Sequence, residues 1–260
     1  APFLFKYVLY IFKMKTNKNF DHEELQNRID LAAAYHLADL YGFSDIIWNH
    51  ITCKTSSKKN TFLINQFGLR YDEVTASNLL EIDLKGNIIS GEGNINFTGF
   101  VIHGAIHQSR EDLNCVMHSH SRSGLAISCL KNGLDILIQD SAMFHNRISY
   151  HDWEGMSTNT EECYSIARDL GNNNTMILRN HGLLTAGKSI GEAFMLMYYL
   201  DRACKVQIDL LNTHQDIIKP SENLLEFAAG QYKNPKYQLG KHEWPALKRM
   251  LNKNNSIYDQ

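Results

Sequence analysis

The spacing of apolar and polar residues predicts helices and strands that follow one another in mixed order along the chain. Apolar residues recur at helical spacing over 22–42 and stop at Gly42. The stretches 45–54 and 61–67 have the composition of strands and flank the polar turn SSKKN. Residues 71–93 predict a short helix followed by a strand that bends back at Lys85-Gly86-Asn87.

The rest of the chain continues this mixed order. The same criteria predict helices at 100–112, 121–133, 159–171 and 191–211, strands at 113–120 and 175–185, and a short strand or loop at 136–155. The apolar face of the last helix is wide enough to suggest burial on two sides. Interleaved helices and strands without an internal repeat predict an α/β or α+β fold.

The two ends of the chain differ from this middle part. The first residues, APFLFKYVLYIFKMK, are apolar but too short to span a bilayer, and Lys6 and Lys13 interrupt them. They also lack the pattern of a signal peptide, and Met14 is a possible alternative start. We therefore expect an N-terminal arm or non-native extension at 1–21, one domain at 22–212, and a tail at 213–260 that packs on the domain or on an oligomer.

Composition narrows the class of protein. Of the 260 residues 43% are hydrophobic and 21% charged, which is ordinary for a globular domain. A net charge of -2 gives no electrostatic reason to expect nucleic acid or an acidic membrane as a partner. The 5 cysteines are widely spaced and form no CxxC pair, so a reducing cytoplasm is the expected location.

Three histidines are the strongest chemical signal. In the stretch CVMHSHSRSG (115–124), His118 and His120 are two residues apart, so they share one face of a strand. His181, in Asn-His-Gly, ends a separate apolar strand. Three neutral imidazoles on a divalent metal leave a position open for substrate or water. The alternative is three structural histidines among the 12 of the chain.

Four blocks of sequence resemble the class II aldolase/adducin superfamily. They are Asn-His-Ile-Thr (49–52), FLINQFGLRYDEVTASNLLEID (62–83), HGAIHQSREDLNCVMHSHS (103–121) and LRNHGLLTAG (178–187). The resemblance implies a three-layer α/β/α sandwich around a central, mainly antiparallel sheet. It also implies a homotetramer with sites at subunit interfaces and a small-molecule substrate. His118, His120 and His181 take the positions of the metal ligands, with zinc the usual ion and manganese or iron in some branches.

One block departs from the aldolase pattern. The aldolases carry Pro-Ser-Ser-Glu, the phosphate-binding serines and the general acid/base, where this chain has Asn96-Phe97-Thr98-Gly99. Gly99 cannot move a proton, and Phe97 cannot hold phosphate. The chain therefore resembles the adducin-like bacterial branch, which lacks the Glu. We expect Thr98 and Gly99 at the substrate, together with Asn49, which could equally tie a turn.

Other residues could replace the missing acid/base. Tyr150 lies near the sequence position at which the aldolases place a tyrosine that is donated across the subunit interface. His151 carries an imidazole, a group that commonly transfers protons in enzymes. An ordinary interface tyrosine is the alternative for Tyr150. His103 and His107 share one helix face and lie over the pocket or simply pack.

Three functions are compatible with these features. The first is a metal-dependent lyase that cleaves by retro-aldol reaction or decarboxylates a small carbonyl or carboxylate compound. The second is a non-catalytic oligomeric module like the adducin head, and the third is an iron-dependent oxygenase on the same scaffold. The retained histidine triad favours the lyase, and decarboxylation needs less of a base.

Overall fold

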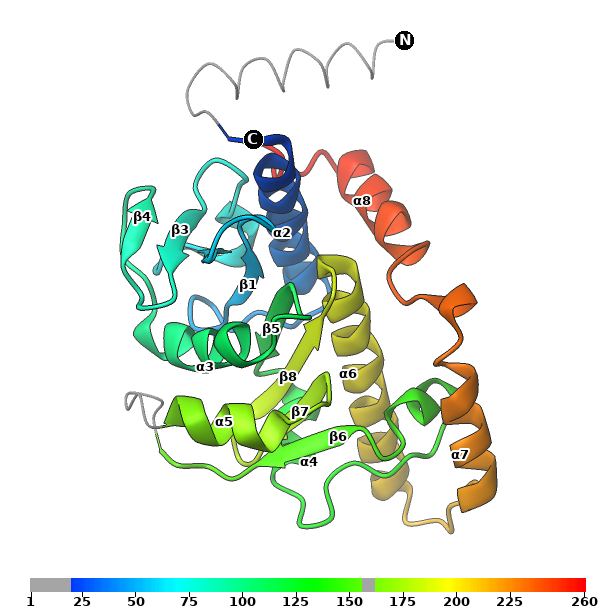
Figure 1. Cartoon of the computed structure of the whole chain (residues 1–260). Helices are drawn as coiled ribbons and strands as arrows, with labels where there is room; N and C mark the ends of the chain where they lie inside the picture. The colour runs from blue at the N-terminus through cyan, green and yellow to red at the C-terminus, as the bar shows by residue number, and fades with distance from the viewer. Residues whose placement is uncertain (1–19, 156–161) are drawn as a thin grey trace.

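The computed structural model describes residues 20–155 and 162–260. Nearly all of the N-terminal arm expected at 1–21, and the first residues of the helix expected at 159–171, lie outside the described residues. Helices and strands alternate as the sequence predicts (Figure 1). The helices are α2 (His22–Leu40), α3 (Phe97–Ser109), α4 (Arg122–Ser128), α5 (Glu162–Leu170), α6 (Ile190–Thr213), α7 (Glu222–Gln231) and α8 (Glu243–Lys253), with 3-10 turns η1 (Tyr71–Glu73), η2 (Gln139–Phe144) and η3 (Pro235–Tyr237).

A single sheet runs through the described residues. Its strands are β1 (Ile51–Lys54), β2 (Thr61–Ile64), β3 (Leu80–Asp83), β4 (Ile88–Ser90), β5 (Cys115–Ser119), β6 (Ile148–His151), β7 (Thr175–Leu178) and β8 (Gly182–Gly187). Their order is β4-β3-β2-β1-β5-β8-β7-β6. Every neighbouring pair is antiparallel except β6 and β7, which are parallel. The expected mainly antiparallel sheet is confirmed.

Both faces of the sheet are covered, because the central strands are apolar on both sides. On β5, Val116 packs with residues of α3 and α5, whereas Met117 packs with residues of α2 and α6. Leu183 and Leu184 on β8 divide in the same way. Figure 1 shows α3 and α5 side by side, with α2 and α6 forming the other layer. This is the predicted three-layer α/β/α sandwich.

Two expected strands are wrong in part, and both corrections bear on the site. Residues 45–50 do not extend β1, because Ile46 has a φ of 50° and the Trp48 amide bonds back to the Asp45 carbonyl. The strand expected at 175–185 is a hairpin of β7 and β8. Asn180 and Gly182, with φ of 56° and 150°, reverse the chain between them.

The C-terminal segment is more regular than its sequence suggests. It forms α7, η3 and α8, which run along the outside of the domain (Figure 1). Trp244 on α8 donates from its indole nitrogen to Asp30 of α2 at 3.2 Å, and Lys248 pairs with the same carboxylate at 2.6 Å. The amide of Ala76 bonds to the Tyr258 carbonyl at 2.9 Å. These contacts hold the segment against α2 and against the loop that follows η1.

Within the described residues, the longest apolar stretch of any helix is too short or too charged to cross a membrane.

Candidate metal centre

The three predicted histidines meet at one end of the sheet. His118 lies on β5, His120 directly follows that strand, and His181 lies in the turn between β7 and β8. Because β8 pairs with β5, the turn lies beside the end of β5. One ring nitrogen from each histidine lies within 4.8 Å of the others. The hairpin turn thus brings His181 to two histidines that lie more than 60 residues before it in the sequence.

Hydrogen bonds fix which nitrogen of two of these rings carries hydrogen. Nδ1 of His118 lies 2.9 Å from the Leu183 carbonyl oxygen, and Nδ1 of His120 lies 2.8 Å from the Asp45 carboxylate. Both partners only accept hydrogen bonds, so each Nδ1 is the donor and each neutral Nε2 bears a lone pair. Those two Nε2 atoms are 2.9 Å apart. Two lone pairs so close are stable only with a cation or proton between them, so the residues fit a metal ion.

Burial keeps two of the ligand histidines neutral. Desolvation lowers the pKa of His118 well below its usual value, and His181 and His120 nearby lower it further. The pKa of His181 is lowered to about 4 by burial, then by His120 and His151. Neutral imidazole is the form that binds a metal ion, so two ligands are ready to bind at neutral pH.

Asn49 supports the centre by bonding to the backbone of His120. It is buried, and its Oδ1 accepts a hydrogen bond from the backbone N–H of His120 at 3.4 Å. Its Nδ2 has no partner among the described residues, which is costly for a buried donor. The structure therefore ties Asn49 to the backbone of a ligand and leaves the NH2 group of its amide available.

Gly99 lies against His50 in the same region. A Cβ atom at position 99 would be 2.8 Å from the His50 ring, so the imidazole fills the space that a side chain there would need. Burial lowers the pKa of His50 to about 3, and His120 and His181 add to this. Thr98, the neighbour of Gly99, is half-buried, and its hydroxyl donates to Asn96 at 2.8 Å.

A cavity of about 370 Å³ opens in front of the histidines. Thr98 and His50 line it, together with Trp48 and Trp153, which are 53% and 62% exposed. Among the residues described, no lysine or arginine lines this cavity. It is small, polar at its base and aromatic at its rim, and it has no cationic group for a phosphate.

The two predicted proton donors, Tyr150 and His151, lie in different surroundings. The Tyr150 hydroxyl accepts a hydrogen bond from the Leu134 amide at 3.1 Å, and Arg179 lies over its ring at 4.2 Å. Tyr150 therefore does not reach the histidine cavity of its own chain. His151 is buried with its Nδ1 2.8 Å from Asp169. It lies close enough to His181 to lower the pKa of that residue.

His103 and His107 pack in the interior, which is one of the two alternatives that the sequence left open for them. Both bond to the Thr52 hydroxyl at 2.8 Å, and His107 stacks on Phe62 with ring centroids 4.9 Å apart. His103 approaches the ring of His50 at 4.3 Å. Neither lines the cavity in front of the metal centre.

The sequence comparisons point to one family. Residues 29–208 match the model of the Class II Aldolase and Adducin N-terminal domain. The chain belongs to this family. Alpha-adducin of Rattus norvegicus is 38% identical over 89% of the chain, which spans only 34% of that longer protein.

Solved structures agree with the family assignment. An aldolase II superfamily protein from Pseudomonas syringae has a TM-score of 0.87 at 37% identity, covering 92% of this chain and 97% of that one. L-fuculose 1-phosphate aldolase from Glaciozyma antarctica PI12 has a TM-score of 0.81 at 28% identity, covering 92% and 93%. The class II aldolase fold expected from the sequence is thereby confirmed.

Several residues of the site were not predicted. Asp45 was expected within a strand, and nothing local in the sequence connects it to His120, 75 residues away. Trp48 and Trp153 likewise have no motif that marks them as cavity residues. His50 did have a signal, because it stands between Asn49 and Ile51 in a block shared with the family.

Proposed function

We propose that the chain is a metal-dependent lyase with His118, His120 and His181 as ligands of one divalent ion, zinc in first place. The observation that carries this proposal is the pair of Nε2 lone pairs 2.9 Å apart, each with its Nδ1 held by an acceptor. Two neutral imidazoles in these tautomers cannot hydrogen-bond to each other, so the contact needs a cation or a proton between the two nitrogens. A bound divalent ion would polarise a carbonyl oxygen and stabilise negative charge that develops on it.

The cavity supports a small carbonyl or carboxylate compound as substrate. Its volume of about 370 Å³ lies near the lower end of the range for ligand pockets. The Thr98 hydroxyl lies at this cavity and would help to orient such a compound. Asn49 and Gly99 do not line the cavity, so their expected contact with substrate stays a prediction. The lack of a cationic side chain argues against a sugar phosphate, although L-fuculose 1-phosphate aldolase is among the structural relatives.

The missing acid/base group favours cleavage without proton abstraction from carbon. Gly99 offers no side chain, and His50 occupies the space beside it. In decarboxylation carbon dioxide leaves where a proton otherwise would, so this reaction places less demand on a base than an aldol reaction. Retro-aldol cleavage needs a proton donor, and we keep Tyr150 and His151 as predicted donors from a second copy.

A homotetramer with sites between subunits fits the rim of the cavity. Trp48 and Trp153 are exposed next to it, and Phe97 is 49% exposed on the first turn of α3. Aromatic side chains of this size are typical of protein interfaces. We therefore propose that a second copy covers the rim and completes the site. Location in the cytoplasm stays a prediction from cysteine usage.

The test is an activity screen of the zinc-loaded protein against small 2-oxo and 3-hydroxy carboxylic acids, with release of carbon dioxide or an aldehyde as readout. The proposal expects turnover that a chelator abolishes, zinc restores and the His120→Ala variant lacks. Turnover that His120→Ala retains would contradict the metal role. A protein that binds zinc but turns over nothing would favour the second candidate, an assembly module, which the 38% identity to alpha-adducin supports.

A further inference from the structure

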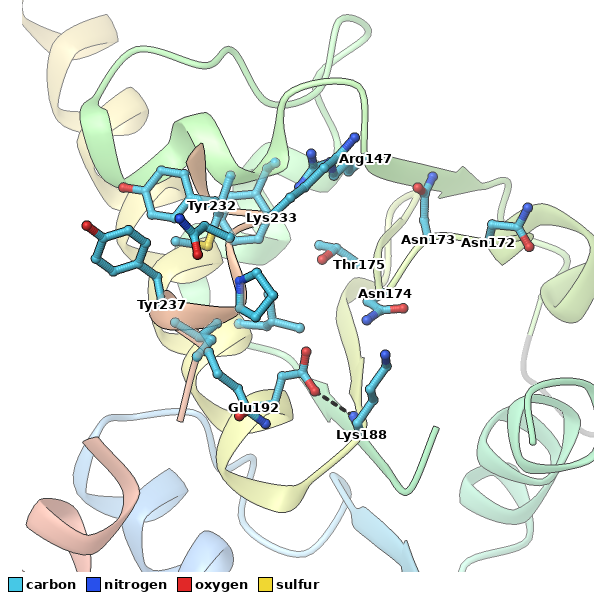
Figure 2. A pocket seen from close by; sticks show the side chains of 17 residues that line it. Arg147, Asn172, Asn173, Asn174, Thr175, Lys188, Glu192, Tyr232, Lys233 and Tyr237 are labelled. Atoms are coloured by element: carbon cyan, nitrogen blue, oxygen red, sulfur yellow. Dashed lines mark hydrogen bonds between the residues drawn. The ribbon is translucent and has the colours of Figure 1, made fainter. Parts of the chain in front are cut away.

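A second cavity, of about 550 Å³, lies between the C-terminal segment and the residues at the open end of the β7–β8 hairpin (Figure 2). Asn172, Asn174, Thr175 and Lys188 form one wall, and the segment that joins α7 to η3 forms the other. Its volume is within the range of small-molecule sites.

This cavity is separate from the metal centre. Thr175 begins β7 and Lys188 follows β8, whereas His181 lies in the turn at the other end of the same hairpin. The two cavities share no lining residue. A ligand here would occupy a place that the histidine chemistry does not use.

The charges around this second cavity are unbalanced. Arg147, Lys188 and Lys233 line it, and Glu192 is its only acidic residue within the described part of the chain. The Glu192 carboxylate already accepts the backbone N–H of Lys188 at 2.7 Å (Figure 2). None of the salt bridges among described residues involves any of the three cations. Arg147 donates from its guanidinium to the Ala229 carbonyl at 3.0 Å, which is a neutral partner. Three cations around one cavity without carboxylate partners favour an anionic ligand.

The remaining lining is divided between apolar and polar groups. The apolar lining residues include Phe144, Leu196 and Leu239. The rings of Tyr232 and Tyr237 lie on one side of the cavity (Figure 2). The asparagines face them across the cavity, and Asn174 is held by a hydrogen bond from Arg110 at 3.1 Å. Such a division suits a ligand with a flat apolar part and a charged polar end.

We propose that this cavity binds a small organic dianion, a ring that carries a phosphate monoester group. The ring would pack against Tyr232 and Tyr237, and the phosphate would lie between Lys188, Lys233 and Arg147. Three cationic side chains and one carboxylate leave an excess of positive charge, and a dianion balances this charge better than a monoanion does. The inference does not depend on the proposed lyase activity.

Isothermal titration of the full chain with three probes tests this inference. Phenyl phosphate carries both features, inorganic phosphate only the charge, and phenol only the ring. We expect phenyl phosphate to bind more tightly than inorganic phosphate and phenol not to bind. The double variant Lys188→Glu/Lys233→Glu should weaken phenyl phosphate binding at least roughly tenfold, because two ion pairs become repulsions. Both lysines are exposed, so the variant is expected to fold, and its melting temperature checks this.

Two controls locate the bound probe. Lys236→Glu/Lys241→Glu makes the same change of charge at exposed residues of the C-terminal segment that do not line the cavity, and should leave binding within about twofold. His120→Ala should also leave binding unchanged. Absence of phenyl phosphate binding would overturn the proposal, as would equal losses in the two double variants. Loss of binding in His120→Ala would place the probe at the histidines and overturn it as well.

Discussion

At the scale of single residues, the partners of the ligand histidines decide how the site works. Asp45 and the Leu183 carbonyl each hold one Nδ1, so both Nε2 lone pairs face the same point. Such outer partners orient the ring and raise the basicity of the ligand nitrogen. A carboxylate does this more strongly than a carbonyl, so Asp45 is the partner whose charge matters most.

Replacing Asp45 with Asn tests this role. The amide oxygen can still accept from Nδ1 of His120, but the negative charge is lost, so we expect zinc affinity to fall about 10- to 100-fold. Competition with a chromophoric chelator measures the change. Asp39→Asn is the matched control, because Asp39 bonds Ser44 and not a histidine. Equal zinc affinity in both variants would show that Asp45 does not support the centre.

Gly99 offers a second test at this scale. In Gly99→Ala the new methyl group would meet the His50 ring at 2.8 Å, so we expect a loss of about 1–3 kcal/mol in the free energy of unfolding. Urea denaturation measures it. Gly230→Ala is the control, because α7 offers open space at that position and alanine is the better helix former. If Gly99→Ala were as stable as the control, His50 would not require a glycine there.

The sequence predicts the ligand histidines better than the residues that hold them in place. His118 and His120 share a strand face through a local spacing, and Asn-His-Gly is a short motif that marks His181. Asp45 reaches His120 only because residues 45–50 turn away from the sheet, and no local pattern of the sequence encodes that approach. For Tyr150 the sequence predicted a catalytic role, but within its own chain the hydroxyl accepts a hydrogen bond from the Leu134 amide.

At the scale of elements, the β7–β8 hairpin is what brings His181 to the other ligands. Periodicity predicts one strand at 175–185, because both strands are apolar throughout and the turn is only three residues long. Asn180 and Gly182, which have positive φ, were the available turn signal within that run.

The start of α3 also differs from the prediction. Asn96 caps the helix by accepting a hydrogen bond from the Thr98 amide at 3.2 Å, so the helix begins earlier than expected.

Gly182→Ala tests the hairpin. Its Cβ would lie 2.5 Å from the Ser119 carbonyl oxygen, at a φ of 150° that side chains rarely adopt. We expect a loss of about 3 kcal/mol in the free energy of unfolding, and weaker zinc binding because His181 is the adjacent residue. Gly42→Ala, at a φ of 74° with open space around it, should cost only about 1 kcal/mol and leave zinc binding unchanged. Equal effects of the two variants on zinc binding would contradict the role of the turn.

At the scale of the whole molecule, the fold concentrates neutral histidines in its interior. Burial is the main cause that lowers the pKa of each of the following: His36, His50, His103, His107, His118 and His181. In the unfolded chain these groups titrate near pH 6.5.

The three-layer architecture was predictable because apolar patterning and family blocks cover its strands. The helical C-terminal segment was not, because its contacts with α2 come from residues far apart in sequence.

This burial predicts a stability that falls in acid. The folded-state pKa values lie below 6.5, at about 4 for His181 and about 3 for His50 and His107, so unfolding takes up protons between these limits. The stabilisation is complete above pH 6.5 and is lost as pH falls toward 3. Each such histidine contributes a slope of up to about 1.4 kcal/mol per pH unit. Urea denaturation with a chelator at pH 7.5 and 5.5 measures it. Equal free energies of unfolding at the two values would contradict the buried, neutral state.

The most direct test of the central claim is the metal content of the purified, untagged protein by plasma mass spectrometry. We expect about one zinc, manganese or iron per chain, and its loss in His120→Ala but not in the control His36→Gln. His36 is buried against the Val74 carbonyl and Ser256, outside the centre. Iron would favour oxygen chemistry, and zinc or manganese would favour carbonyl polarisation. A metal-free protein that no added ion stabilises, or equal metal in both variants, would contradict the proposed centre.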